Sequence, residues 1–94
     1  MRVADRIKQK LEAEFRPTRL AVIDDSARHH GHAGARPEGE THFKVEIVAP
    51  AFAGRSRVDR QRLVYQALAE ELAGRVHALE VRTLTPEEDR ADRH

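Results

Sequence analysis

The stretch that decides the fold is THFKVEIVA, residues 41–49. Apolar and charged side chains alternate along it, in the order Phe43, Lys44, Val45, Glu46 and Ile47. A period of two residues is typical of a β-strand that packs one face on a core and exposes the other. We therefore predict a strand here, and the elements on either side are placed relative to it.

Two further elements are predicted on the N-terminal side of this strand. The stretch VADRIKQKLEAEF, residues 3–15, carries apolar residues at every fourth position, which is the stripe of an amphipathic helix. Pro17 disfavours the helical conformation at the residue before it, so the helix should end at residue 15 or 16. The stretch RLAVID, residues 19–24, is rich in aliphatic and β-branched residues and predicts a short strand that ends in turn-forming residues.

Helix and strand patterns also follow the central strand. APAFAG, residues 49–54, predicts a turn with room for one short helical turn. Ser56 and Asp59 then form an N-cap pair for the main helix, whose apolar residues have the spacing of a core-facing stripe and which Gly74 ends. HALEVRTLT, residues 77–85, alternates again and predicts a third strand.

The order of these elements predicts an α+β fold (αββααβ) with a three-stranded mixed sheet and helices on one face. The first two strands should pair antiparallel. A right-handed crossover through the main helix should place the third strand parallel to the second. We expect a single domain over residues 1–86, a long loop over residues 26–40 between the first two strands, and a mobile charged tail over residues 87–94.

Composition limits the function classes. The chain has 94 residues with 17 basic and 16 acidic side chains, and a formal net charge of +1 argues against binding a polyanion through the overall field alone. It contains no cysteine, which excludes disulfides, thiol catalysis and thiolate metal ligands from this chain. The common nucleophile, phosphate-loop and zinc-protease motifs are missing from the sequence, so we expect no enzyme activity and no small-molecule substrate.

The sequence also gives an expectation for location. The N-terminus alternates charged and apolar residues and lacks the continuous apolar region of a signal peptide. No stretch of the sequence approaches the roughly 18 apolar residues of a membrane span. We therefore expect a cytoplasmic protein with no membrane partner.

The long loop contains the stretch ARHHGHAGARPEG, residues 27–39, which places His29, His30 and His32 within four positions. Its Gly, Ala and Pro content suits neither a helix nor a strand. Loops of this length in a small domain are usually functional or disordered. A solvated polar loop and a metal-binding loop are both consistent with these residues.

Several ordered motifs together resemble the BolA family. They are THFKV (41–45), AFAG (51–54), the arginines at 60 and 62 in FAGRSRVDRQRLVY, LAEEL (68–72), and VHAL (76–79) followed by LTP. The resemblance extends over nearly the whole chain. It implies the α+β topology predicted above, which is similar to that of class II KH domains. It also implies one of two roles: partnership with a monothiol glutaredoxin in iron–sulfur cluster handling, or regulation through DNA binding.

In the first role, the resemblance makes His77 a ligand of a [2Fe–2S] cluster shared with the glutaredoxin. Alignment of the loop with the family pattern gives His32 as the second ligand, with about one residue inserted, and His29 as the alternative. A glutaredoxin cysteine and glutathione would supply the sulfur ligands, so the isolated chain should hold no cofactor. From the residues alone, His77 also fits a half-buried histidine bonded to the backbone, and His42 is expected to be structural.

In the second role, a local basic cluster lies at the start of the main helix, where backbone N–H groups also favour phosphate: Arg55, Arg57, Arg60 and Arg62. The same charges fit a solvated helical face paired with nearby acids. The chain has RQR at residues 60–62 where the family usually has RHR, and GRSR at 54–57 has only the first glycine of a KH-type GXXG loop. Contact of the arginines with DNA phosphates is the form of nucleic-acid binding that these residues favour.

Overall fold

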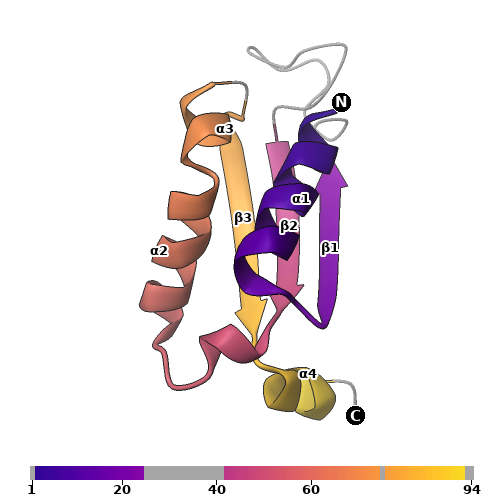
Figure 1. The fold of residues 1–94 in the computed structure, drawn as a ribbon, viewed down its shortest axis with the longest axis vertical. Coiled ribbons are helices and arrows are strands. Elements are labelled where there is room, and N and C mark those ends of the chain that lie inside the picture. Colours follow the sequence, from indigo (N-terminus) through magenta and orange to yellow (C-terminus); the bar gives the residue numbers. More distant parts are fainter. Residues whose placement is uncertain (1, 25–41, 75, 93–94) are drawn as a thin grey trace.

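The computed structural model describes residues 2–24, 42–74 and 76–92 of the 94-residue chain. Its elements follow in the order α1 (Val3–Phe15), β1 (Arg19–Asp24), β2 (His42–Val48), the 3-10 turn η2 (Pro50–Phe52), α2 (Arg57–Ala67), α3 (Ala69–Ala73), β3 (Ala78–Leu84) and α4 (Pro86–Asp92). Figure 1 shows α1 and α2 lying along the sheet and α4 at one end of it. The predicted α+β class is confirmed, and α4 is an additional element.

The three strands form one mixed sheet in the order β1-β2-β3. Strand β1 pairs antiparallel with β2, with Arg19 opposite Val48 and Asp24 opposite Phe43. Strand β3 pairs parallel with β2, with His42 opposite Ala78. Both pairings agree with the sequence prediction. Because β2 and β3 are parallel, their first residues lie at the same end of the sheet.

The core lies between one face of the sheet and helices α1 and α2. Its buried apolar residues come from α1, β2, η2, α2 and their connections: Ile7, Leu11, Phe15, Phe43, Val45, Ile47, Ala49, Phe52, Val64, Leu68 and Val76. The alternating residues of β2 that predicted a strand are therefore the ones that face the helices. The Phe15 and Phe52 rings pack at 5.2 Å between centroids and tie the end of α1 to η2.

The helix ends follow the local sequence. Arg16 ends α1 in the left-handed conformation, with φ of 47°, and its N–H donates to the Glu12 carbonyl at 3.0 Å. The Ser56 side chain accepts the Asp59 N–H at 3.1 Å, which confirms Ser56 as the N-cap of α2. Gly74 ends α3, and its N–H donates to the Glu70 carbonyl at 3.1 Å.

The predicted main helix is divided at Leu68, between α2 and α3. The backbone there has φ of −106° and ψ of 20°, outside the helical range. The Leu68 N–H still donates to the carbonyls of Val64 and Tyr65, at 3.1 and 3.2 Å. A local change of backbone dihedrals therefore divides the helix without loss of the hydrogen bond at this position.

Helix α4 corrects the expectation of a mobile charged tail after residue 86, because residues 86–92 form this helix. A capping box begins it: the Thr85 hydroxyl accepts the Glu88 N–H at 3.2 Å, and the Glu88 carboxylate accepts the Thr85 N–H at 2.8 Å. Pro86 occupies the first helical position, where its missing N–H is not needed. The motif that was interpreted as the end of the domain therefore starts a helix.

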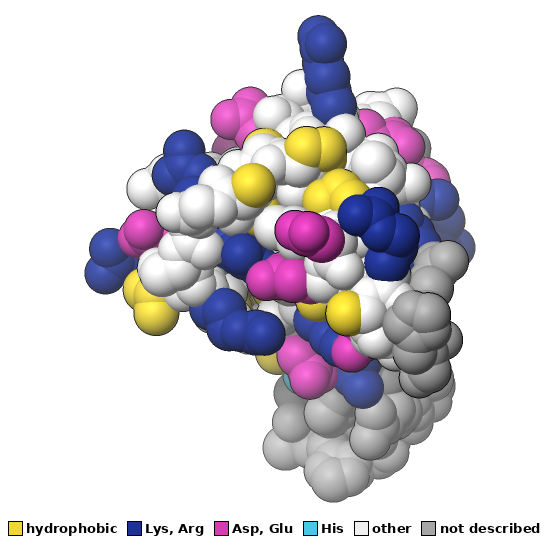
Figure 2. All heavy atoms as spheres, turned by 90° about the horizontal axis from the view of Figure 1, so that it is seen from below, with side chains coloured by type: hydrophobic (Ala, Val, Ile, Leu, Met, Phe, Trp, Pro, Cys, Tyr) yellow, Lys and Arg dark blue, Asp and Glu magenta, His cyan; other side chains and the backbone are white. Residues whose placement is uncertain are grey.

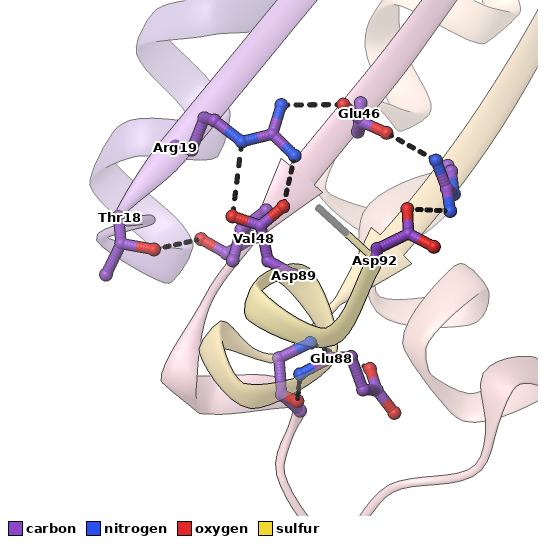
Figure 3. Close-up of polar contacts among 9 residues, drawn as sticks. Thr18, Arg19, Glu46, Val48, Glu88, Asp89 and Asp92 are labelled. Carbon is purple, nitrogen blue, oxygen red and sulfur yellow. Dashed lines mark hydrogen bonds and ion pairs between the residues drawn. The ribbon is translucent and has the colours of Figure 1, made fainter. Parts of the chain in front are cut away.

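Acidic residues of α4 attach it to arginines of the sheet. Figure 3 shows Arg19 of β1 between Glu46 of β2 and Asp89 of α4, with contacts of 2.6 Å to each carboxylate. Arg82 of β3 joins the same Glu46, at 2.9 Å, to Asp92. The hydrogen bonds to Asp89 and Glu46 raise the pKa of Arg19, and those from Arg19 and Arg82 lower the pKa of Glu46. All three strands are thereby linked to α4 through ion pairs.

At the end of the sheet next to α4, apolar side chains are also buried on the face away from the main core. Side chains of a strand point alternately to opposite faces, so Val48 does not share the face of Ile47. Val48 is nevertheless fully buried, and so is its cross-strand neighbour Leu84, at 4% exposure. A second, small apolar contact region therefore lies at this end of the sheet, where α4 follows β3.

Candidate functional site

His77 and His42 lie together at the end of the sheet where β2 and β3 begin. Figure 1 shows α4 at the other end of the sheet. His77 directly precedes Ala78, the first residue of β3, and His42 is the first residue of β2 and pairs with Ala78. The two imidazole rings are 6.3 Å apart between centroids, at an interplanar angle of 69°. His77 is exposed and His42 is half-buried. The predicted ligand His77 therefore has a second histidine beside it, which the sequence analysis had assigned a structural role.

The backbone on both sides of His77 is fixed by the fold. Val76 is 4% exposed within the core, and its N–H donates to the Glu71 carbonyl at 3.1 Å. On the other side, Ala78 enters the β2–β3 ladder, and the Tyr65 hydroxyl donates to the Leu79 carbonyl at 3.2 Å. His77 is thus an exposed side chain on a constrained backbone, an arrangement that suits a ligand.

The other two predicted ligands, His32 and His29, lie outside the described residues. The segment that contains them connects Asp24, at the end of β1, to His42, at the start of β2. Asp24 pairs with Phe43, so both attachment points of the segment are at the end of the sheet where His77 lies. The two ends of the histidine-bearing loop are therefore attached to the sheet at the end where His77 lies.

The donor set at this end suits a metal group with additional ligands from elsewhere. Among residues 2–24, 42–74 and 76–92, no group of three or more His, Asp or Glu side chains is placed to hold a metal ion. A four-coordinate metal that takes one imidazole from His77 leaves three positions for other donors. Histidine is a ligand of [2Fe–2S] iron in Rieske centres, where two imidazoles replace two thiolates on one iron. The exposed His77 imidazole therefore fits one ligand position of a histidine-ligated metal group.

Only three of the four arginines in the predicted basic cluster are exposed to solvent. Arg55, Arg57 and Arg62 are exposed at the start of α2, and the Arg62 guanidinium is 3.9 Å from the Asp59 carboxylate. Arg60, in contrast, is 6% exposed, and its Nε donates to the Arg55 carbonyl at 3.0 Å. The structure therefore removes Arg60 from the predicted nucleic-acid-binding surface and gives it a structural role.

The partner of Arg60 is Glu88 of α4. The guanidinium donates to the two carboxylate oxygens at 2.7 and 3.3 Å. These bonds, together with the Thr85 N–H, lower the pKa of the Glu88 carboxyl to about 2. Arg60, which was a candidate because of its place in the basic cluster, therefore contacts the C-terminal helix.

Charges of both signs occupy the end of the molecule that carries the exposed arginines. Figure 2 shows this end, where basic and acidic side chains are intermingled. In Figure 1, the start of α2 lies at the opposite end of the sheet from the first residues of β2 and β3. The histidine pair and the exposed arginines are therefore two separate candidate surfaces.

Within the part of the chain that the structure describes, no helix combines the length and apolar character needed to cross a bilayer. The cytoplasmic location expected from the sequence stays a prediction.

The sequence and the fold match a known class of small α+β proteins. A family model described as BolA-like protein matches residues 11–88. The solved structure of BolA1 from Arabidopsis thaliana superposes with a TM-score of 0.84 at 43% identity, covering 94% of this chain and 96% of that one. The chain belongs to the BolA-like protein family.

Two curated relatives show the range of proteins in which this domain occurs. The DNA-binding transcriptional regulator BolA of Escherichia coli is 44% identical over 88 residues, covering 94% of this chain and 80% of that protein. SufE-like protein 1 of Arabidopsis thaliana is 47% identical over 87 residues, which are 88% of this chain but 24% of that protein. The chain therefore spans about a quarter of this second relative.

Sequence reasoning missed two features of these surfaces. The contact between His42 and His77 was deducible in principle, because the predicted parallel pairing brings the starts of the second and third strands to one end of the sheet. The burial of Arg60 depends on α4, which was not predicted, and no pattern within α2 distinguishes Arg60 from its exposed neighbours.

Proposed function

We propose that this protein is a non-catalytic partner of a monothiol glutaredoxin, with which it shares a [2Fe–2S] cluster in iron–sulfur cluster trafficking and iron homeostasis. His77 is one ligand. His32 of the long loop is the second, with His29 as the alternative. A glutaredoxin cysteine and glutathione supply the sulfur ligands, and the isolated chain has no resident cofactor.

The observation that carries this proposal is the position of His77. It is exposed at the end of the sheet where the histidine-bearing loop starts and finishes, and its backbone is held on both sides. An exposed imidazole on a constrained backbone binds a partner's metal group with little loss of backbone freedom. Family membership supports the same assignment, because the VHAL motif at residues 76–79 contains this histidine.

The chemistry gives the shared site two expected properties. Two neutral imidazoles in place of two thiolates make the cluster less anionic and raise its reduction potential. Imidazole with a reference pKa of about 6.5 must lose its proton before it binds iron, so acid should release the cluster from this chain. The role of this chain's residues is to present the imidazoles and orient them toward the partner.

The test is anaerobic reconstitution of a [2Fe–2S] cluster on an equimolar mixture of this protein, a monothiol glutaredoxin and glutathione, followed by visible absorption and circular dichroism. Wild type should give a spectrum that differs from that of the glutaredoxin alone. His77→Ala and one of His32→Ala or His29→Ala should remove that difference, whereas His94→Ala should not. A spectrum that is unaffected by this protein would contradict the proposal.

A second candidate function is DNA binding, as in the name of the Escherichia coli relative. Exposure of Arg55, Arg57 and Arg62 around the N-cap Ser56 favours it. These side chains would contact phosphates, so Arg62→Gln should weaken binding to unrelated duplexes alike and reduce the slope of log affinity against log salt by about 1. Arg60→Gln, which removes the same charge from a buried position, is the matched control. Equal effects of the two variants would argue against this surface.

A further inference from the structure

Helix α4 is an acidic segment that lies against arginines of the sheet. Its sequence, PEEDRAD, contains four carboxylates and one arginine. Figure 3 shows Asp89 facing Arg19, from which it accepts two hydrogen bonds, from Nε at 3.4 Å and from Nη2 at 2.6 Å. Asp92, one turn further along the helix, pairs with Arg82. Two arginines of the sheet are therefore occupied by carboxylates of one helix.

The contact of α4 with the sheet depends mainly on charge. All seven residues of Pro86–Asp92 are described, and none of them is buried. A helix of two turns is marginally stable by itself in water, and ion pairs between partly exposed groups contribute little each. The side chains of Arg19 and Arg82 are 31% and 52% exposed. A competing anion can therefore displace the α4 carboxylates from these two arginines while Glu88 stays bonded to Arg60.

The geometry at Arg19 indicates the class of anion. A guanidinium binds phosphate through the same two-point arrangement of N–H donors with which it binds a carboxylate. Asp89 uses this arrangement, so a phosphate group can take its place. Glu46 contacts both Arg19 and Arg82, at 2.6 and 2.9 Å, which holds the two guanidiniums in position and offsets one of their charges.

Other arginines at the same end of the molecule favour a ligand with several phosphates. Helix α4 contacts α2 through Glu88 and Arg60, so it lies beside both the main helix and the sheet arginines. The end of the molecule in Figure 2 carries basic side chains from both. The exposed arginines around the start of α2 are Arg55, Arg57 and Arg62. A nucleic-acid backbone, with its row of phosphates, can contact both groups of arginines.

We propose that Arg19 and Arg82 form a phosphate-binding site for duplex DNA, and that Asp89 and Asp92 of α4 compete with the phosphates for it. This proposal rests on the second candidate function, DNA binding, and extends it to a surface of the sheet. Helix α4 is then an internal competitor that lowers the affinity of the full chain for nucleic acid. Neutralising its two carboxylates should raise that affinity without adding an arginine.

The test is the affinity of the full chain for a short fluorescent duplex of unrelated sequence, measured by anisotropy over a series of salt concentrations. Asp89→Asn combined with Asp92→Asn should bind about tenfold more tightly than wild type, with a slope of log affinity against log salt that is steeper by about 1–2. Adding Arg19→Gln and Arg82→Gln should remove this gain. Thermal unfolding shows whether each variant is folded.

Glu87→Gln is the matched control for Asp92→Asn. Each removes one carboxylate charge from α4, but Asp92 pairs with Arg82, whereas Glu87 has no ion pair among the residues that the structure describes. A general change in electrostatic field would raise the affinity equally in both variants. Competition for the arginines makes the gain larger for Asp92→Asn.

A second measurement uses wild type and requires no variant. If phosphates displace Asp89 and Asp92, the end of α4 loses its attachment to the sheet. Hydrogen exchange of the backbone amides of residues 89–92 should therefore become faster when the duplex is bound. Slower or unchanged exchange at saturating duplex would overturn the proposal, because DNA would then bind without displacing α4.

The outcomes separate this site from DNA binding itself. Three results of the affinity measurements would overturn the proposal: the Asp89→Asn and Asp92→Asn variant binds no more tightly than wild type, its gain persists after both arginines are replaced, or Glu87→Gln gains as much as Asp92→Asn. In each case Arg62→Gln still tests the second candidate function by itself. A complete lack of duplex binding by wild type and by the variant would contradict both.

Discussion

Arg60 of α2 and Glu88 of α4 are joined by two hydrogen bonds between the guanidinium and the carboxylate, at 2.7 and 3.3 Å. The arginine side of this pair is buried, with 7% of its side chain exposed, and the glutamate side is 40% exposed. Glu88 also closes the capping box that starts α4. One carboxylate therefore fixes both the start of the C-terminal helix and its contact with the main helix.

Loss of this contact should destabilise the fold. Arg60→Gln leaves Glu88 without its charged partner, and hydrogen bonds to charged groups contribute about 1.5–3 kcal/mol. We expect the free energy of unfolding, measured in urea, to fall by about that amount.

Arg62→Gln provides the matched control for this measurement. It removes the same charge from the same helix, but its side chain is 72% exposed. We expect its effect to stay within about 0.5 kcal/mol. Equal effects of Arg60→Gln and Arg62→Gln would show that the buried pair contributes nothing particular to stability.

The low pKa of Glu88 predicts acid sensitivity. In the folded chain this pKa is about 2, against an ordinary value of 4.5, so the unfolded state binds more protons between these two values. The pair therefore contributes its full stability above pH 4.5 and loses it progressively as the pH falls toward 2.

The size of this acid effect should be modest because solvent screens the partly exposed Glu88, and we expect about 1 kcal/mol. The measurement is the midpoint of thermal unfolding between pH 6 and pH 2 for wild type and Glu88→Gln. The difference between the two proteins should shrink toward low pH. A difference that stays constant across this range would contradict the assignment.

The backbone of Arg16 gives a prediction in the opposite direction. Arg16 has a left-handed φ of 47°, which is unfavourable for any residue with a Cβ by roughly 1–2 kcal/mol. Glycine removes this strain but gains freedom in the unfolded chain, so Arg16→Gly should stabilise the protein by a net value of about 0.5–1 kcal/mol.

The control for the Arg16 prediction is Arg16→Ala, which removes the same side chain but keeps a Cβ. Its free energy of unfolding in urea should not rise above that of wild type. If alanine stabilised the protein as much as glycine does, the gain would come from loss of the arginine side chain and not from relief of the backbone.

Much of the fold followed from local patterns. The alternation in residues 43–47 predicted β2 and the side of it that faces the core, and the Ser56 N-cap predicted where α2 begins. The parallel pairing of β2 and β3 followed from the handedness of crossovers. These features depend on short stretches of sequence or on general rules of chain topology.

The features that were not predicted depend on distant contacts. Thr85 and Glu88 have the spacing of a capping box, but Pro86 and the charged residues after it were interpreted as the end of the domain. The ion pairs that hold α4 come from three other elements, so no local pattern reveals them. The division of the main helix at Leu68 has no local marker such as glycine or proline. The predicted parallel pairing brings the starts of β2 and β3 to one end of the sheet, but the register that sets His42 opposite Ala78 was not predicted.

The central claim is that an imidazole of this chain binds the iron of a cluster shared with a glutaredoxin. The most direct measurement is pulsed EPR on the reduced complex, prepared from this protein labelled with ¹⁵N-histidine and an unlabelled glutaredoxin. We predict strong ¹⁵N couplings from two imidazoles, and loss of the His77 coupling, or of the cluster itself, in His77→Ala. A reduced cluster with no ¹⁵N coupling from this chain would contradict the claim.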